Sequence, residues 1–301
     1  MNNLQAVREP RPRRKAGRIW AAGGLLFLSV GFLLAGGQTR FDRVFDTTAN
    51  PRISITNMTG EVTIKGWDKP QVHALCTTSS SRVEVDSETM PRSAPAEKIH
   101  FTTHVLDPLV SGKDETADYV LEVPLNSSLE IRNRQGSIRI EKLLGEAWVE
   151  SVVATIFVAD VAGHLAVRSV GGDIEIVRPS GRVEASSITG NLHFLFPTAP
   201  KLRGSTTSGN IVYEGDFVAG GDYTLSAYSG GMDIFCPSSA SFELNAKTVR
   251  GKLNNSFPLE PKRHSASPLS SANSLLGTHN TGNATVELTS FSGNIRIRRQ
   301  P

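Results

Sequence analysis

The sequence predicts an all-β fold, a β-solenoid of stacked strands similar to a parallel β-helix, preceded by one N-terminal transmembrane helix. One repeat of 18 to 21 residues recurs from Ile53 almost to the C-terminus, with apolar and polar residues alternating around a central glycine. The apolar positions of successive repeats fall into the same columns. A two-strand unit of this length cannot bury its own apolar face, whereas stacked units join the columns into one core.

A turn residue stands at the centre of each repeat, and it is glycine in all repeats except one, where Ala154 stands. Glycine suits a turn with positive φ or a close approach of neighbouring backbones. The last step between centres is 42 residues, two periods of 21, which predicts one degenerate or looped-out coil. The predicted structural turn positions are Gly60, Gly136, Gly172, Gly190, Gly209, Gly230, Gly251 and Gly293.

Two short strands are expected to flank every centre. The position two residues after the centre is always apolar, and the position four residues after it is apolar in every repeat but one, which carries Asn255. This period-2 alternation predicts strands rather than helices. A second turn signal follows three of the centres, at Gly145, Gly163 and Gly181, so each coil is expected to turn twice.

Two segments interrupt the repeat domain, which is expected to span residues 45–299. Residues 71–125 contain longer alternating segments, at 98–105 and 119–123. We expect them to cap the N-terminal edge of the solenoid, because open sheet edges invite aggregation. Residues 257–282 are rich in Ser, Pro and Asn and are expected to form an irregular loop.

The N-terminus combines a basic tail with a hydrophobic segment. Residues 1–18 hold six basic residues and one acidic residue, and residues 19–37 hold no charged side chain. At about 1.5 Å per residue, the second segment spans about 28 Å, close to the hydrocarbon thickness of a bilayer. The tail is therefore expected in the cytoplasm, and the repeat domain in the periplasm or outside the cell, in a single-pass cell-membrane protein.

A cleaved signal peptide is the alternative interpretation of residues 19–37. The small residues Ala35, Gly36 and Gly37 suit a signal peptidase, and cleavage would release a secreted or periplasmic chain that begins near Gln38. The length of the apolar run favours a retained anchor. The chain after the tail holds 26 basic and 28 acidic residues, so the net charge of +3 arises in the tail and does not indicate binding to nucleic acid.

A column of small polar residues lies three positions before the centres. A serine in this column could act as a nucleophile, but no Gly-x-Ser-x-Gly motif accompanies it. Small hydroxyl and amide side chains commonly bond to the backbone of turns, so a structural role is predicted. The column comprises Asn57, Asn133, Ser151, Ser169, Ser187, Thr206, Ala227, Thr248 and Ser290.

Two other groups of side chains are candidates for chemistry. The outward residues Asp173, Glu175 and Asp233 could form an acidic strip for a cation or for cleavage of a sugar, but solvated strand faces are normally charged. His100 and His104 are expected on one face of a strand. No third ligand lies near them in the sequence, so exposed strand residues are predicted rather than a metal site.

The cysteines and the last arginines also receive structural interpretations. Cys76 and Cys236 are predicted to be free thiols, because six coils at about 4.8 Å each would separate them by about 29 Å. Arg296, Arg298 and Arg299 crowd the last strand. They are interpreted as charges that protect an exposed end of the solenoid, with docking of an acidic polymer as the alternative.

Five strand segments share a degenerate motif: Tyr119–Pro124 (YVLEVP), Leu129–Ile131 (LEI), Gly136–Ile140 (GSIRI), Gly172–Ile176 (GDIEI) and Ser292–Ile297 (SGNIRI). They resemble the bacterial putative-adhesin family of β-strand repeats, also called Toastrack domains, over roughly residues 45–299. The resemblance implies an exported or membrane-anchored domain of stacked strands, in a family of largely unknown function proposed to serve in adhesion or envelope-stress sensing. It implies no catalytic residues.

The sequence therefore predicts a non-enzymatic, membrane-anchored, extracytoplasmic β-repeat module for binding or envelope structure, with no cofactor, metal or catalytic residue. Its expected partners are the membrane, through residues 19–37, and an envelope polymer or protein, but not nucleic acid. The alternatives are a sensor or accessory subunit of an envelope-stress system and a polysaccharide-active enzyme. The aromatic content of 7% argues against a dedicated groove for stacking sugars.

Overall fold

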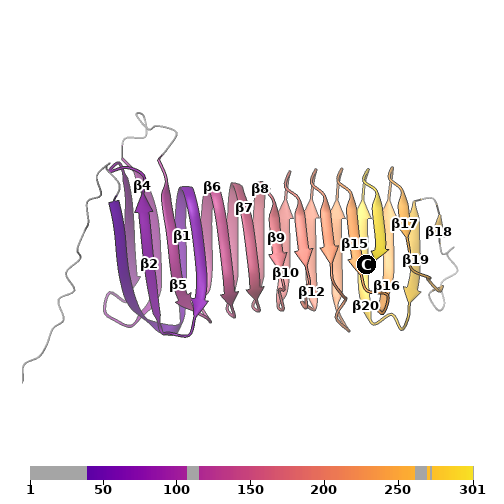
Figure 1. Ribbon diagram of the computed structural model, residues 1–301, viewed down its shortest axis with the longest axis horizontal. Helices are drawn as coiled ribbons and strands as arrows, with labels where there is room; N and C mark the ends of the chain where they lie inside the picture. The colour runs from indigo at the N-terminus through magenta and orange to yellow at the C-terminus, as the bar shows by residue number, and fades with distance from the viewer. Residues whose placement is uncertain (1–38, 107–114, 262–269, 272, 301) are drawn as a thin grey trace, which may run out of the picture. The chain divides into compact units, whose positions relative to one another are not determined.

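The computed structural model describes residues 39–106, 115–261, 270–271 and 273–300. The predicted tail at 1–18 and the predicted membrane segment at 19–37 lie outside these residues. Every element in the described ranges is a β-strand, and they contain no helix of the length and hydrophobicity that a bilayer span needs. The all-β class is confirmed, and the strands join into one sheet that winds through stacked coils (Figure 1).

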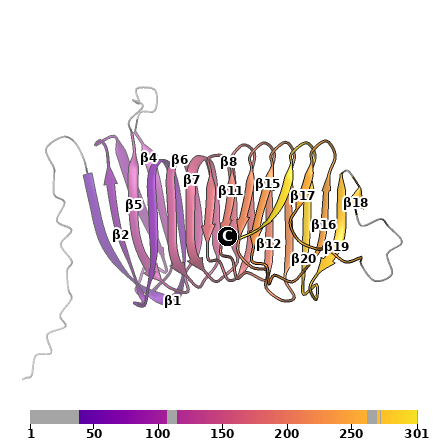
Figure 2. The same cartoon turned by 45° about the vertical axis from the view of Figure 1, so that its right-hand side comes forward.

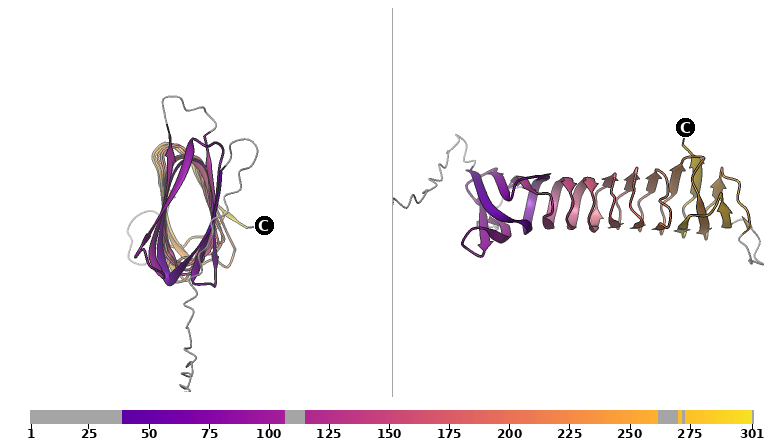
Figure 3. Two further views of the ribbon diagram at one scale, coloured as in Figure 1. Left: turned by 90° about the vertical axis from the view of Figure 1, so that its left-hand side faces the viewer. Right: turned by 90° about the horizontal axis from the view of Figure 1, so that it is seen from below.

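Each coil contributes one strand before its central turn and one strand after it. We call the sheet of strands before the turns the first face, and the sheet after them the second face; Figure 3 looks along the stack and shows both faces around the core. Neighbouring coils pair in parallel and in register, so that Gly60 lies beside Gly136, and Gly136 beside Ala154. The solenoid predicted from the apolar columns is confirmed.

The first coils are continuous through the central turn, whereas the later coils break there. The long strands are β1 (Thr39–Trp67), β6 (Ser128–Leu143) and β7 (Ala147–Val161). In spatial order, the first face continues with β8 (Leu165–Gly171), β10 (Arg182–Ser187), β12 (Lys201–Thr206), β14 (Asp222–Ala227), β20 (Ala284–Ser290) and β16 (Phe242–Thr248). The second face continues with β9 (Ile174–Val177), β11 (Leu192–Leu195), β13 (Ile211–Glu214), β15 (Met232–Cys236), β21 (Ile295–Arg299) and β17 (Leu253–Asn255).

The segment that interrupts the repeat near the N-terminus forms an ordered cap. It contains β2 (Gln71–Thr78), β3 (Val83–Met90), β4 (Ala96–Val105) and β5 (Ala117–Pro124). β4 and β5 pair in parallel with β1 on the two faces, β3 lies antiparallel on β4, and β2 lies antiparallel between β5 and the start of β1. The exposed Glu84, Asp86 and Glu88 line the edge strand β3, where charge discourages pairing with another chain.

The order of the last coils differs from their order in the sequence. β20 and β21, which flank Gly293, insert between the coil of Gly230 and the coil of Gly251 (Figures 1 and 2, yellow strands). Of the two predictions for the 42-residue step, a degenerate coil is wrong and a looped-out segment fits, because the strands within residues 270–279 run antiparallel to their neighbours. The chain instead passes over one position in the stack and returns to fill it.

The segment at 257–282, expected to be an irregular loop, contains two strands. β18 (Ser270–Ser271) and β19 (Ser274–His279) run antiparallel to each other, and β19 runs antiparallel to β16. They cover the end of the first face (Figure 2). On the second face, β17 pairs with β21 and forms the last strand of the stack among the described residues.

The apolar columns explain why the coil of Gly293 occupies an interior position. The coil of Gly251 carries the half-buried Asn255 in its column, and a polar group costs less at the end of a stack than between two coils. β20 and β21 present four large aliphatic side chains that are at most 2% exposed: Val286, Leu288, Ile295 and Ile297. These side chains can pack against a coil on each side.

Candidate binding groove

The outward residues of the first face form a groove across the first coils. Side chains alternate along a strand, so the residues between two core positions point away from the core. A hollow of about 340 Å³ lies over β1, β6, β7 and β8, and a second of about 320 Å³ lies over β8, β10, β12 and β14. Ala166 on β8 lines both hollows, so together they make one groove, which we call the first-face groove.

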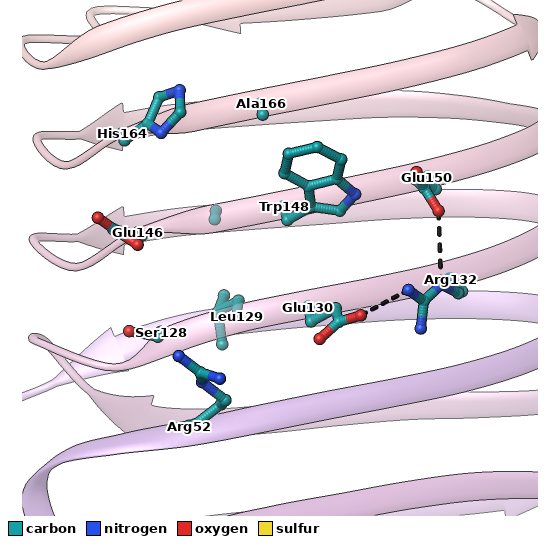
Figure 4. A pocket seen from close by; sticks show the side chains of 11 residues that line it. Arg52, Ser128, Leu129, Glu130, Arg132, Glu146, Trp148, Glu150, His164 and Ala166 are labelled. Carbon is teal, nitrogen blue, oxygen red and sulfur yellow. Dashed lines mark hydrogen bonds and ion pairs between the residues drawn. The ribbon is translucent and has the colours of Figure 1, made fainter.

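Trp148 on β7 is the aromatic residue of the first hollow (Figure 4). Its half-buried side chain stands beside the small Ala166 of β8, its direct partner in the parallel register. The guanidinium carbon of Arg168 lies 4.7 Å from the centroid of the indole ring, within cation–π distance. The groove therefore contains a large apolar ring whose orientation is restrained by a neighbouring cation.

Charged side chains border Trp148 on the side of β6. Arg132 pairs with Glu130 at 2.6 Å and, across the coil spacing, with Glu150 at 3.4 Å (Figure 4). Exposed ion pairs of this kind contribute only about 0–1 kcal/mol to stability. Their main effect is to hold three planar polar groups in fixed positions beside the ring.

The other border of the first hollow lies where the strands begin. Arg52, Ser128, Glu146 and His164 line it on successive coils. The Nε2 atom of His164 is buried and has no hydrogen-bond partner among the described residues. A buried polar atom without a partner costs free energy, and a ligand in the hollow could bond to this nitrogen only if the imidazole ring moved.

The second hollow has a floor of hydroxyl groups. Ser186, Ser205 and Ser226 occupy the same outward position on β10, β12 and β14, and Arg203 stands beside them. Over both hollows, the lining includes four arginines and four glutamates. The formal charges therefore balance, apart from that of His164.

The inward columns that predict the fold do not include these groove residues. Trp148 stands six positions before the centre of its repeat, and Arg168 and Ser186 stand four positions before theirs. The same alignment, applied to these outward positions, would have placed one tryptophan and a run of serines on one face of neighbouring coils.

Seven of the nine members of the small polar column bond to backbone, which is the structural role predicted for the column. The hydroxyl of Thr206 accepts a hydrogen bond from the N–H of Gly209 at 3.0 Å and donates one to the carbonyl of Gly190 at 3.1 Å. Thr248 and Ser290 make the same pair of bonds, each to the glycine of its own turn and to that of a neighbouring coil. These hydroxyls therefore tie successive turns together.

The predicted turn glycines stack along one edge of the solenoid. At Gly172, where φ is +99°, a Cβ atom would lie 2.2 Å from the carbonyl oxygen of Ala154 in the preceding coil. At each of the other predicted turn glycines, a Cβ would lie between 1.6 and 2.2 Å from a carbonyl oxygen of the neighbouring strand. Close backbone approach thus accounts for glycine at these centres.

The candidate acidic residues do not form a strip. Asp173 and Glu175 belong to one coil, and Asp233 belongs to a coil three steps further along. Asp173 accepts hydrogen bonds from the backbone and side-chain N–H groups of Asn191, at 2.8 and 3.0 Å, and Asp233 pairs with Arg296 at 3.1 Å. In the described ranges, no three His, Cys, Asp or Glu residues could hold a metal ion.

The other candidate residues lie apart from the groove. His100 and His104 are exposed on β4, as predicted, and His104 lies 3.4 Å from a carboxylate oxygen of Asp86. Cys76 and Cys236 are buried free thiols, which confirms the prediction that they are not linked. Burial raises the pKa of each thiol to about 12.

The interpretation of the last arginines as guards of an exposed end is wrong. Arg296, Arg298 and Arg299 lie on β21, which is paired with β15 on one side and with β17 on the other. The guanidinium carbons of Arg298 and Arg299 lie 5.9 and 5.7 Å from the ring centroids of Phe235 and Phe257. These arginines therefore reach across to neighbouring coils and pack on side chains there.

Comparison with known proteins identifies the family. The family model described as Toastrack DUF4097 matches residues 122–298. A putative adhesin from Bacteroides fragilis has a similar solved structure, with 10% identity, 86% of this chain and 97% of that chain covered, and a TM-score of 0.44. A putative cell adhesion protein from Clostridium sporogenes is 10% identical over 87% of this chain and 100% of its own, with a TM-score of 0.28.

A putative adhesin from Parabacteroides merdae is 8% identical over 89% of this chain and 98% of its own, with a TM-score of 0.32. The comparison with curated proteins finds no match. The family model matches more than half of the chain, and it covers every coil from β6 to β21. This protein therefore belongs to the Toastrack DUF4097 family.

Proposed function

We propose that this protein is a non-enzymatic, membrane-anchored module that displays its β-solenoid outside the cytoplasm and binds an envelope polymer along the first-face groove. The groove itself carries the proposal. It follows the stacking axis over seven neighbouring strands, from β1 to β14. A surface that repeats at every coil suits a ligand that also repeats along its length.

The chemistry of the candidate residues supports binding rather than catalysis. The hydroxyls of Thr206, Thr248 and Ser290 are engaged with turn backbone, and the carboxylates of Asp173 and Asp233 belong to separate coils. In the groove, Arg132 is held between two glutamates. These arrangements suit non-covalent recognition of a polar ligand.

The proposed location rests on the N-terminal sequence. The uncharged segment at 19–37 has the length of a bilayer span, and the basic tail before it favours a cytoplasmic N-terminus. The solenoid would then face the polymers of the envelope.

A sedimentation experiment tests the groove. Full-length protein in detergent micelles is mixed with bacterial envelope polymer that has been washed free of membranes, and the bound fraction is measured. Ser205→Tyr on β12 fills the groove, whereas Val212→Tyr puts the same side chain on the second face of the same coil. We expect at least tenfold weaker binding for Ser205→Tyr alone; equal binding by the two variants would show that the groove is not the binding site.

Protease treatment of sealed spheroplasts, followed by intact mass measurement, tests the location. We expect the solenoid of the full-length protein to be digested from outside. A mature chain that begins near Gln38 would indicate a released module instead of an anchored one. Complete protection of the solenoid would contradict the proposed orientation.

A further inference from the structure

We infer that the polymer bound in the first-face groove is a neutral glycan, with one sugar ring stacked on Trp148. The inference rests on the proposed function and names its ligand class. It follows from four properties of the groove: its aromatic ring, the polar groups beside that ring, its charge balance and its direction.

The aromatic ring provides the apolar contact. A pyranose ring has C–H groups on its faces and hydroxyl groups around its rim, so it can lie on an indole and keep its polar rim in water. Trp148 is half-buried in the hollow, and Ala166 beside it leaves space for a flat ligand. The guanidinium of Arg168 lies over one face of the ring and restrains it before a ligand arrives, which reduces the entropy lost on binding, so the sugar would stack on the opposite face.

The polar groups beside the ring match the hydroxyl rim of a sugar. Glu130 and Glu150 accept hydrogen bonds, and Arg132, fixed between them, donates them. Neighbouring hydroxyls of a sugar can bond to both edges of such planar groups.

The charge balance selects a neutral polymer. A groove that binds a polyanion is lined by an excess of basic residues, because each anionic group needs a counter-charge. Here four arginines stand beside four glutamates, so an anionic chain would meet as many repulsive as attractive charges. Nucleic acid and phosphate-rich polymers are disfavoured for the same reason.

The direction of the groove fits a chain that lies along the stacking axis. Seven strands spaced by about 4.8 Å span about 29 Å. The length that each sugar adds to an extended glycan chain is similar to the spacing between two neighbouring coils. The hydroxyl floor at Ser186, Ser205 and Ser226 repeats at this spacing. A peptide that adds a strand needs a free sheet edge, but β6 to β12 are paired on both sides in the first face.

The low aromatic content of the chain does not contradict this inference. The 7% is an average over all residues, and it carries no information on where a single tryptophan lies. One ring on the outer face of a strand is enough to orient one sugar, and the remaining contacts can be polar.

The test measures binding of full-length protein in detergent to an array of neutral and anionic glycans. Trp148→Ala should weaken binding to neutral glycans about tenfold, since it removes the large apolar surface on which the sugar ring lies. Trp148→Phe should retain most of the affinity. Phe157→Ala is the matched control, because Phe157 lies on the second face of β7 under Arg139, whose guanidinium carbon is 4.2 Å from the ring centroid.

The outcomes separate this inference from the proposed function. Binding of neutral glycans that Trp148→Ala weakens and Phe157→Ala does not would support the inference. Binding to anionic glycans only, or to no glycan while sedimentation with envelope polymer still depends on Ser205, would overturn the inference and leave the proposed function standing. Loss of the groove-dependent sedimentation as well would overturn both.

Discussion

The central coils and the C-terminal coils share one repeat but are ordered differently. From β6 to β15, each coil lies beside its neighbours in the sequence. In the C-terminal coils, β20 and β21 return past β16 and β17 to lie beside β14 and β15. The repeat thus determines how a coil folds, whereas the place of a coil depends on which apolar columns fit together.

Deletion of residues 284–301 should cause the largest difference in stability between the C-terminal coils and the central coils. It removes four large buried aliphatic side chains, a gross loss of roughly 6–12 kcal/mol, which is comparable to the stability of a whole domain. Because coils of a solenoid contact only their neighbours, we expect the C-terminal coils to unfold while the central coils remain folded.

The rate of alkylation of the two buried thiols measures which coils unfold after this deletion. Cys236 lies on β15, directly beside Arg299 of β21, and should become reactive, whereas Cys76 in the N-terminal cap should stay protected. A synthetic peptide of residues 284–301 added to the truncated protein should restore protection of Cys236. If both cysteines became reactive at the same rate, the two regions would fold as one cooperative unit.

Substitution of turn glycines should have the next largest effect. Gly172→Ala puts a methyl group 2.2 Å from a carbonyl oxygen and forces a positive φ on alanine, so we expect a loss of about 2–4 kcal/mol. The adjacent Gly171→Ala is the control, because its Cβ would lie 3.2 Å from the side-chain oxygen of Thr189 and no closer than 3.8 Å to a backbone oxygen. Gly251→Ala should cost less than Gly172→Ala, since its coil lies at the end of the stack and can shift outward.

Denaturant unfolding of the three glycine variants provides the measurement. The transition that reports the central coils should move to lower denaturant for Gly172→Ala and stay in place for Gly171→Ala. If Gly251→Ala destabilised the protein as much as Gly172→Ala, the last coil would be held as rigidly as the central coils.

The polar column should show a smaller effect. Thr206→Val keeps the shape of the side chain but leaves the N–H of Gly209 and the carbonyl of Gly190 without their partner, a loss of about 1–3 kcal/mol. Ser151→Ala is the comparison, because the hydroxyl of Ser151 is buried without a partner among the described residues. Thermal unfolding should show a lower Tm for Thr206→Val and no decrease for Ser151→Ala; a decrease for both would indicate that Ser151 is bonded to water.

A change of pH should have the smallest effect. It should alter the stability of the N-terminal cap by at most about 1 kcal/mol, because the ion pairs there are exposed. His73 lies 2.9 Å from a carboxylate oxygen of Asp42, and this hydrogen bond raises the pKa of His73 and lowers the pKa of Asp42. The stabilisation from His73 is fully present below its unfolded pKa of about 6.5 and is lost as the pH rises through the folded pKa. That from Asp42 is lost as the pH falls from about 3.9 through its lowered pKa.

Hydrogen exchange of β2 as a function of pH measures this contribution. Protection should be greatest between these two limits and should decrease above them and below them. His73→Gln should remove the dependence at the upper limit. An unchanged dependence in this variant would assign it to another group.

Much of the fold followed from local pattern. The columns around Gly136, Gly172 and Gly190 predict both strands and the register between coils, because each side chain must match the same position one coil away. The place of the last coil could not be read from spacing, since a step of two periods fits either a missing coil or a chain that returns. Asn255 was the available signal, because it marks the coil that tolerates a polar residue in its column.

The groove was harder to predict from the sequence than the fold. Core positions repeat because every coil needs them, whereas the outward positions of Trp148, Arg168 and Ser186 differ from coil to coil. Their meaning depends on which coils are adjacent and on how far each side chain reaches across a coil. The buried nitrogen of His164 also required coordinates, since its lack of a partner depends on packing.

The inserted coil also has a consequence for the time course of assembly. For a solenoid displayed outside the cytoplasm, the chain crosses the membrane with its N-terminal coils first, so every coil up to that of Gly230 can pack on the preceding coil as it emerges. The coil of Gly251 emerges before β20 and β21, the strands that join it to the stack. We therefore expect a nascent chain stopped before residue 284 to hold a finished stack of coils with one unattached coil behind it. Such an intermediate would be open to proteases until the next sixteen or so residues are made.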